Sequence, residues 1–258
     1  MLLLDLTLPT PGANLALEEA LLDRESAPAV PVLRLWEFDD YFVVLGRSSR
    51  IREVHAERCQ TEGVPILRRA SGGGVVLAGP GCLMYSLVLP QETLGRSRGI
   101  DAAHSYVLGR MVHSLQPAAP SVIRSGTSDL TLSIDGARMK FSGNALRMRA
   151  NRFLYHGSLL YNFDLARVSR LLSDPVRTPD YRGDRGHEGF VTNLHLSRAE
   201  LRKALISEWS ANEPLLDPPI PEAEALAKTK YVNKDWNFKG QWPQPSAIPF
   251  NNERNTPQ

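Results

Sequence analysis

The sequence has only two cysteines, Cys59 and Cys82, in 258 residues. Two thiols are too few for a disulfide scaffold or a thiolate metal site. No apolar run approaches the roughly 20 residues that a membrane span requires. The apolar start MLLL lacks the basic flank of a secretory signal and breaks at Asp5. We therefore expect a cytoplasmic protein that does not bind membranes.

Lysine is scarce as well. The 30 Lys+Arg and 28 Asp+Glu residues give a net charge of +2, which provides no argument for nucleic-acid binding. Residues 1–200 hold 22 arginines and a single lysine, Lys140. An arginine bias can be genomic drift without function. A lysine that persists in this background is nevertheless a candidate for chemistry, because its ammonium is a compact point charge and guanidinium is a planar fork.

Hydrophobic periodicity outlines a single domain of α+β class. Helical spacing predicts helices over residues 14–24, 51–62, 101–115, 164–172 and 197–210, the first an amphipathic helix with Asn14 as its N-cap. Strands are predicted at 32–45 (two strands around a turn), 64–68, 83–89, 122–124, 129–134, 138–142 and 154–163. The hairpin turn Asp135-Gly136 and the absence of a regular βαβ rhythm favour antiparallel pairing over a doubly wound parallel sheet.

The composition changes near residue 211. Eight of the 19 prolines fall after residue 210. We expect an irregular extension of one domain that spans residues 1–240, and a loosely ordered tail over 241–258. Nothing in this tail suffices for an independent accessory domain.

Three segments could carry chemistry. Arg68 to Val76 reads RRASGGGVV. Its glycines would let a ligand approach the backbone closely, and its arginines could hold anionic oxygens, although a flexible surface loop is an equal alternative. Residues 135–145 place Lys140 beside a Ser-Gly-Asn turn, where a solvated edge-strand charge is the alternative. His156, within YHGSLL, could equally be a structural histidine. No serine-hydrolase elbow or zinc spacing is present.

These segments together resemble the lipoate–protein ligase A family, within the biotin and lipoate ligase superfamily. The resemblance lies in RRASGGGVV, GTSDL (126–130), MKFSGNA (139–145) and YHGSLLYNFDL (155–165), and also in NLALEEALL, LGRS, VTNL and DWNF. It implies a mixed, largely antiparallel sheet flanked by helices. It also implies activation of lipoate with ATP and Mg²⁺ to lipoyl-AMP. Transfer would then go to a lysine of 2-oxoacid dehydrogenase lipoyl domains or the glycine-cleavage H protein, with a separate accessory-domain protein as a further partner.

The resemblance also implies roles for individual residues. Lys140 matches the family lysine that bridges the acyl carbonyl and the phosphate, and Asp129 matches an aspartate that orients this lysine or binds Mg²⁺. The residues expected to bind the acyl chain or adenylate are Arg69, Ser71, Gly72, Gly73, Gly74, Val75, Val76, Asp129, Gly143, Asn144, Ala145, His156, Gly157 and Ser158.

The sequence departs from the family pattern in places that leave alternatives open. Val76-Leu77-Ala78-Gly79 lacks the polar pair that usually follows the glycines, and Thr127 and Ser128 replace larger groups. One alternative is an octanoyl or lipoyl transferase that uses a thioester, for which Cys82 would be the thiol. Another is a non-catalytic lipoyl-binding protein. A biotin ligase is disfavoured because its arginine- and glycine-rich adenylate loop is not present.

Overall fold

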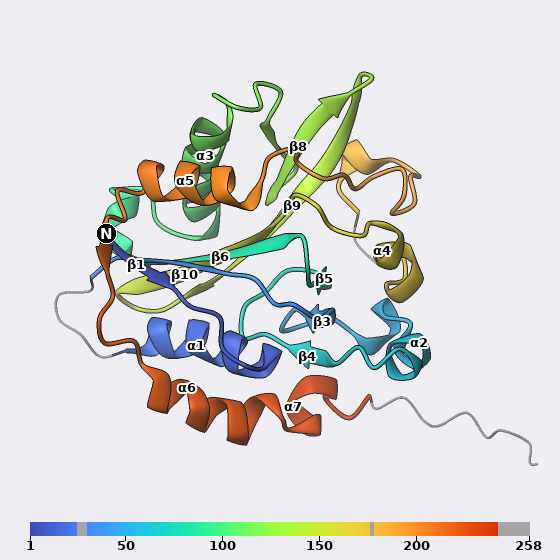
Figure 1. The fold of residues 1–258 in the computed structure, drawn as a ribbon, viewed down its shortest axis with the longest axis horizontal. Helices are drawn as coiled ribbons and strands as arrows, with labels where there is room; N and C mark the ends of the chain where they lie inside the picture. The colour runs from blue at the N-terminus through green and yellow to red at the C-terminus, as the bar shows by residue number, and fades with distance from the viewer. Residues whose placement is uncertain (25–29, 176–177, 242–258) are drawn as a thin grey trace, which may run out of the picture.

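A mixed sheet of eight strands forms the centre of the molecule (Figure 1). The computed structural model describes residues 1–24, 30–175 and 178–241. The strands lie in the order β11-β1-β2-β6-β10-β9-β8-β7. Their bounds are Glu213–Pro214, Leu2–Asp5, Val32–Trp36, Cys82–Pro90, Arg152–Leu160, Ala137–Met148, Asp129–Ile134 and Ile123–Ser125. Within the described strands of this large sheet, only the β11/β1 and β1/β2 pairs are parallel, so the predicted α+β class with a largely antiparallel sheet is confirmed.

A second, smaller sheet and the helices cover the two faces of the large one. The small sheet has the order β4-β3-β5 (Ile66–Arg68, Phe42–Leu45 and Val76–Ala78). The remaining elements include α2 (Ala56–Thr61), α3 (Ile100–Leu115), α4 (Ala166–Leu171), α5 (Arg198–Glu208) and the short helical turns Ile51–Glu53, Gln91–Leu94 and Asp180–Arg182. Figure 1 shows α3 and α5 on one side of the large sheet and α1 (Pro11–Asp23) on the other. None of the described helices is long and apolar enough to cross a membrane.

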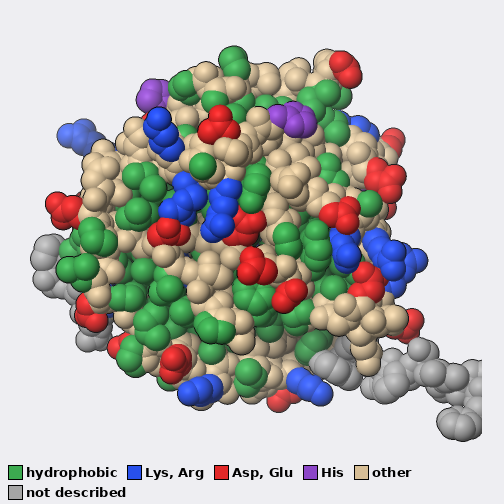
Figure 2. All heavy atoms as spheres, in the orientation of Figure 1, with side chains coloured by type: hydrophobic (Ala, Val, Ile, Leu, Met, Phe, Trp, Pro, Cys, Tyr) green, Lys and Arg blue, Asp and Glu red, His purple; other side chains and the backbone are tan. Residues whose placement is uncertain are grey.

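The strand pattern of β6 shows how the sequence divides the core. Cys82, Met84 and Val88 point into the core on the α1 side, and the alternate residues Leu83, Tyr85, Leu87 and Leu89 point into the core beneath α3 and α5. Successive side chains of a strand face opposite sides, so one apolar run serves two cores. On the surface, Figure 2 shows acidic and basic side chains interspersed over one face, in keeping with the small net charge.

Helix α1 differs from the expected amphipathic helix. It begins at Pro11, and the Thr10 side chain caps it by accepting a bond from Ala13 N at 3.1 Å. Asn14, which was expected to be the cap, is buried inside the helix and binds both backbone groups of Leu8. The helix is enclosed between the large sheet and the C-terminal segment (Figure 1), so even Glu18 and Glu19 are buried.

The predicted irregular extension is also different in the structure. It contains α6 (Ile220–Leu226), a π-helical turn (Ala227–Tyr231) and α7 (Lys234–Phe238), which pack beneath α1 and beside β4. Proline does not prevent a helix here: Pro221 occupies the first turn of α6, where a fixed backbone angle favours the start of a helix. The predicted tail over 241–258 lies, apart from Gln241, outside the described residues. Strands β1, β5 and β11 were not predicted.

The α7 segment binds β4 through side-chain and backbone hydrogen bonds. The amide of Asn237 accepts from Arg68 N at 2.9 Å and donates to Tyr231 O at 2.9 Å. The Trp236 indole donates to Arg68 O at 2.8 Å. The C-terminal segment therefore fixes the strand that leads into the glycine-rich loop.

We expect Asn237→Ala to lower the free energy of unfolding by about 1–3 kcal/mol, because it leaves the buried backbone N–H of Arg68 without its acceptor. Urea denaturation followed by circular dichroism measures this change. Asn212→Ala, at an exposed position, is the control and should stay within about 0.5 kcal/mol of the parent chain. Equal effects of the two substitutions would contradict the role given to Asn237.

Candidate active site

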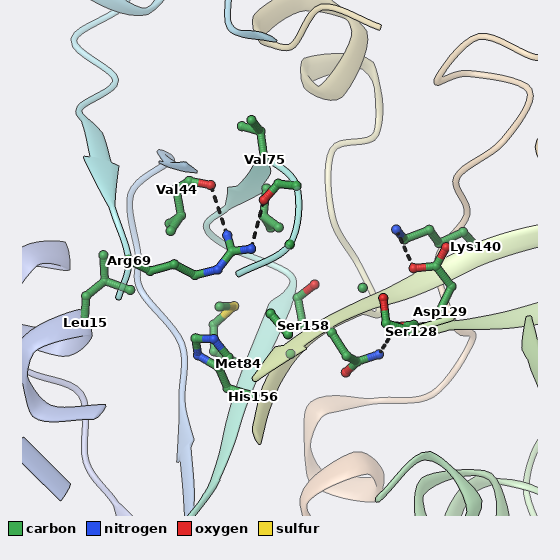
Figure 3. Close-up of a pocket in the computed structure, with 17 residues that line it drawn as sticks. Leu15, Val44, Arg69, Val75, Met84, Ser128, Asp129, Lys140, His156 and Ser158 are labelled. Carbon is green, nitrogen blue, oxygen red and sulfur yellow. Dashed lines mark hydrogen bonds and ion pairs between the residues drawn. The ribbon is translucent and has the colours of Figure 1, made fainter. Parts of the chain in front are cut away.

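Two adjoining cavities lie where the glycine-rich loop meets β8, β9 and β10 (Figure 3). The inner cavity includes Leu15, Val44 and Met84 in its wall, and the outer cavity includes Leu160, Phe190 and Val191. The two share the following residues: Gly74, Val75, Val76, Ser128, Asp129, Lys140, Gly143 and Ser158. All residues predicted for the site line the inner cavity except Ser71 and Gly72.

Lys140 forms an ion pair at the junction of the two cavities. Its Nζ lies 2.7 Å from Asp129 Oδ1, and Tyr181 donates to Asp129 Oδ2 at 2.8 Å. Asp129 is buried, whereas about 29% of the Lys140 side chain is exposed. The ammonium is thus held from one side by a fixed carboxylate and is open to the cavities on the other. The alternative of a solvated edge-strand charge does not hold, because the ammonium pairs with a buried carboxylate and the Lys140 backbone is paired on both sides, with Thr131 and with Val191.

The backbone of Lys140 is fixed on the side that β8 does not cover. Its N donates to Phe190 O and its O accepts from Thr192 N, both at 2.8 Å. Residues 190–192 thus add a short parallel bridge at Lys140. The VTNL segment therefore serves to fix the strand that carries the lysine.

The side chains of both arginines next to the glycines donate hydrogen bonds to protein backbone, and Arg69 also lines the inner cavity. Arg69 donates through Nη2 to Gly72 O at 2.5 Å and Gly74 O at 2.9 Å, and through Nη1 to Val44 O at 3.3 Å. Arg68 donates to Gly46 O and Ser49 O through Nη1. Burial lowers the pKa of Arg69 to about 10, still well above neutrality. In this structure the two guanidinium groups hold backbone carbonyls, and the expected contact of Arg69 with anionic oxygens of a ligand stays a prediction.

A buried hydrogen-bonded row connects α1 to this loop. Glu18 Oε2 lies 2.6 Å from His156 Nδ1, and His156 Nε2 lies 2.5 Å from Ser71 Oγ, which also accepts from Arg69 Nε at 3.0 Å. Every group is satisfied when His156 carries its proton on Nδ1 and Ser71 donates to Nε2. Burial by itself would raise the pKa of Glu18, but His156, Arg34 and Ser86 together lower it.

This row has the order of a serine-hydrolase triad but not its accessibility. Ser71 is buried and lies outside both cavities, so its hydroxyl does not face a bound substrate. His156 lines the inner cavity, yet both ring nitrogens are directed at protein groups. The row therefore positions the loop. Sequence reasoning found Ser71 and His156 but gave no role to Glu18, which lies in the helix predicted over residues 14–24.

Asn144 and Gly157 fit against each other across neighbouring strands. A Cβ atom on Gly157 would lie 1.9 Å from Asn144 Oδ1. That oxygen accepts from Tyr85 Oη at 2.5 Å, and Asn144 Nδ2 donates to Ser128 O at 2.8 Å. The amide thus fixes the segment that precedes Asp129, and only glycine leaves room for it.

Neither cysteine has the environment of a nucleophile. Both are fully buried and line neither cavity. Burial, with a contribution from Glu37, raises the pKa of Cys82 to about 12, and burial with Glu62 nearby raises that of Cys59 to about 11. A thiol of this kind is not ionised at neutral pH and packs as a small apolar side chain.

The outer cavity contains residues that the sequence did not reveal. Tyr181, Arg182 and His187 come from the segment that precedes VTNL, and Arg182 and His187 line the cavity. Burial lowers the pKa of His187. No residue spacing connects this segment with Asp129, since the contact arises only from the fold. The signal available was the presence of aromatic and basic residues directly before VTNL.

A resident metal site is not formed by the described residues. They contain no group of three or more histidine, cysteine, aspartate or glutamate side chains able to hold a metal ion. Asp129 supplies one carboxylate, and both of its oxygens already accept hydrogen bonds. A role for Asp129 as a Mg²⁺ ligand stays a prediction.

Comparisons with known proteins agree with the resemblance found in the sequence. Residues 10–208 match the family model described as the lipoyl protein ligase A/B catalytic domain. A putative lipoate-protein ligase A of Aeropyrum pernix is 29% identical over 243 residues, which are 87% of this chain and 87% of that protein.

Solved structures share the fold over nearly the whole chain. One is from a study of a bi-partite lipoate protein ligase of Thermoplasma acidophilum and its E2 lipoyl domain; it is 24% identical, with a TM-score of 0.79 over 95% of this chain and 98% of that one. A lipoate-protein ligase A bound with ATP is 25% identical, with a TM-score of 0.76 over 92% and 98% of the two chains.

Substitution of Gly157 tests the packing of the site. We expect Gly157→Ala to lower the free energy of unfolding by about 1–3 kcal/mol, because the added methyl overlaps the Asn144 amide. Gly157→Ala with Asn144→Ala relieves the overlap, so the double substitution should cost less than the sum of the two single ones. Strict additivity in thermal or urea unfolding would contradict this contact.

Thiol labelling tests the state of the cysteines. We expect a disulfide reagent such as DTNB to react with neither Cys59 nor Cys82 in the folded protein at pH 8, and with both after denaturation, because burial suppresses both access and ionisation. The absorbance of the released thiolate measures the reaction. Fast labelling of Cys82 in the folded chain would show that the thiol is accessible and activated.

Proposed function

The chain belongs to the lipoyl protein ligase A/B catalytic-domain family, and from this we propose that it activates lipoate with ATP to lipoyl-AMP and transfers the lipoyl group to a protein lysine. Its relatives and structural neighbours are lipoate-protein ligases, one of them solved with ATP. The predicted family is confirmed. The non-catalytic alternative is disfavoured by the retained Lys140 and Asp129 pair.

The position of Lys140 carries this proposal. Its ammonium lies where a cavity lined in part by Leu15, Val44 and Met84 joins a second cavity with polar groups such as Ser142 and Thr127. An acyl chain in the inner cavity and a nucleotide in the outer one would meet at this point. The mixed anhydride of an acyl-adenylate has its reacting oxygens at such a junction.

The chemistry needs fixed positive charge more than a proton donor. When the lipoate carboxylate attacks the α-phosphorus of ATP, a bond forms between a carboxylate oxygen and phosphorus, and pyrophosphate leaves. Two anionic groups are brought together, so an ammonium preorganised by Asp129 stabilises the developing charge. In the second step a lysine amine attacks the acyl carbonyl and AMP leaves with the electron pair of the anhydride bond. The same ammonium faces the departing phosphate.

The thioester alternative lacks its nucleophile. The chain has two cysteines, both buried, outside the cavities and with raised pKa values. An acyl-enzyme route needs an accessible thiolate next to the acyl carbonyl. Lysine-assisted adenylate chemistry requires no such group, and this supports the ligase over the transferase.

Mg²⁺ and the partners belong to the proposal as well. Because Asp129 is the sole carboxylate among the described residues that line the cavities, Mg²⁺ would enter as the complex with ATP. The bi-partite ligase of Thermoplasma acidophilum supports a separate accessory chain as a partner. The acceptors of the lipoyl group would be lipoyl domains of 2-oxoacid dehydrogenases or the glycine-cleavage H protein. The protein would act in the cytoplasm.

Substitution of Lys140 tests the proposed function. We expect Lys140→Ala to lower lipoate-dependent ATP–pyrophosphate exchange by about 100-fold or more, because the transition state loses its preorganised charge. Lys140→Arg restores the charge but not its compact shape, so it should recover only part of the rate. Exchange of labelled pyrophosphate into ATP measures the first step, with an accessory chain added if the single chain is inactive.

Cys82→Ser is the matched control and should leave exchange within about twofold, since the thiol packs in the core. Transfer of an acyl group from acyl carrier protein that needs no ATP and disappears in Cys82→Ser would contradict the proposal. So would full exchange activity in Lys140→Ala.

A further inference from the structure

A turn between β3 and α2 lies against the glycine-rich loop. Arg47 N donates to Ser71 O at 2.8 Å, and Ser49 Oγ donates to Gly73 O at 3.3 Å. A Cβ atom on Gly46 would lie 2.0 Å from Gly73 O, so the two backbones touch. Gly73 lines the inner cavity. The turn therefore lies next to the cavity, behind Gly73, but none of its residues lines the cavity.

Three arginine side chains of this turn are unusual because none of the described residues partners them. Arg47, Arg50 and Arg52 are exposed, and no side-chain hydrogen bond or ion pair holds any of them within the described part of the chain. Most described arginines are engaged, as in the pairs of Arg147 with Glu19 and Arg202 with Asp5. Among the described arginines, the others without a side-chain partner are Arg96, Arg98 and Arg138, so half of this group falls on a single six-residue turn.

A lysine adds to this positive rim. Lys239 is exposed and donates to Arg47 O, and burial together with Arg68 and Arg47 lowers its pKa. The turn contains one carboxylate, Glu53, which accepts from Arg50 N at 2.7 Å. We call Arg47, Arg50, Arg52 and Lys239 the basic rim; with Glu53 its charge remains clearly positive.

The opposite side of the cavities exposes negatively charged side chains. The segment that precedes VTNL exposes Asp174, Asp180, Asp184 and Glu188, whereas its Arg182 is buried and its Arg185 donates to backbone oxygens. Among the described residues the rim of the site is thus polarised: three unpaired arginines lie beside the glycine-rich loop, whereas one, Arg138, lies beside this acidic segment.

We infer that the basic rim is the docking surface for an acidic patch beside the acceptor lysine of the partner lipoyl domain. This inference rests on the proposed transfer to a protein lysine. The rim adjoins the inner cavity at Gly73, so an acceptor lysine that enters on this side would pass beside the rim. Unpaired surface cations lose no internal ion pair when a carboxylate approaches, and complementary charge raises the rate and specificity of encounter.

The test uses the full chain, chemically prepared lipoyl-AMP as donor and an apo E2 lipoyl domain as probe acceptor, so that transfer is measured without adenylation. Arg50→Glu with Arg52→Glu should raise the KM for the lipoyl domain about tenfold and leave kcat within about twofold. The decline of kcat/KM with added NaCl should also become shallower, because surface attraction is screened by salt. A lysine in place of a carboxylate beside the acceptor lysine should restore part of the loss.

Arg96→Glu with Arg98→Glu is the matched control. It makes the same charge change on exposed arginines beyond the other end of β6. Equal KM values in the two double variants, or an unchanged KM in Arg50→Glu with Arg52→Glu, overturn the inference.

Failure of the proposed function gives a different result, namely no transfer by the parent chain. Binding of the apo lipoyl domain is then measured directly by calorimetry. An affinity that falls in the rim variant but not in the control supports the docking surface even so. The same affinity in both, including none, overturns it.

Discussion

The site depends on two buried guanidinium groups that bind backbone carbonyls. Arg69 holds the glycine-rich loop by Gly72 O and Gly74 O, and Arg68 holds the adjoining turn by Gly46 O and Ser49 O. Three successive glycines have no side chains with which to fix their own conformation, so a flexible loop would result without these bonds. Arginine suits this position because its planar fork donates in several fixed directions at once.

Two adjacent glutamates on α1 anchor two different parts of the site. Glu18 reaches the loop through His156 and Ser71, whereas Glu19 binds Arg147, Lys230 and Tyr231. Burial by itself would raise the pKa of Glu19, but these partners lower it. Buried charges are tolerated only when they are paired and fully hydrogen-bonded, and here both carboxylates are. One turn of helix therefore connects the central sheet, the glycine-rich loop and the C-terminal segment.

The sequence predicted the residues that line the site better than the buried residues and helices that hold them in position. Lys140, Asp129 and the glycines were recognisable because their residue types and order are unusual. The strands β6 and β10 were visible from their long apolar runs. The burial of Glu18 was not foreseen because the helix over residues 14–24 was predicted to be amphipathic, and α6 and α7 were missed because proline suggested irregular structure. Tyr181 reaches Asp129 across 52 residues, a contact that no local pattern encodes.

The bonds between Arg68 and the α7 segment join residues 168 and 169 positions apart. A chain is synthesised from its N-terminus, and contacts this distant form late because a large loop must close first. The residues that line the cavities are all made before residue 192. Their loop gains its final support only when residues 236 and 237 arrive. The residues that line the cavities are thus synthesised well before the α7 segment that braces their loop, and loss of α7 would loosen the glycine-rich loop through β4.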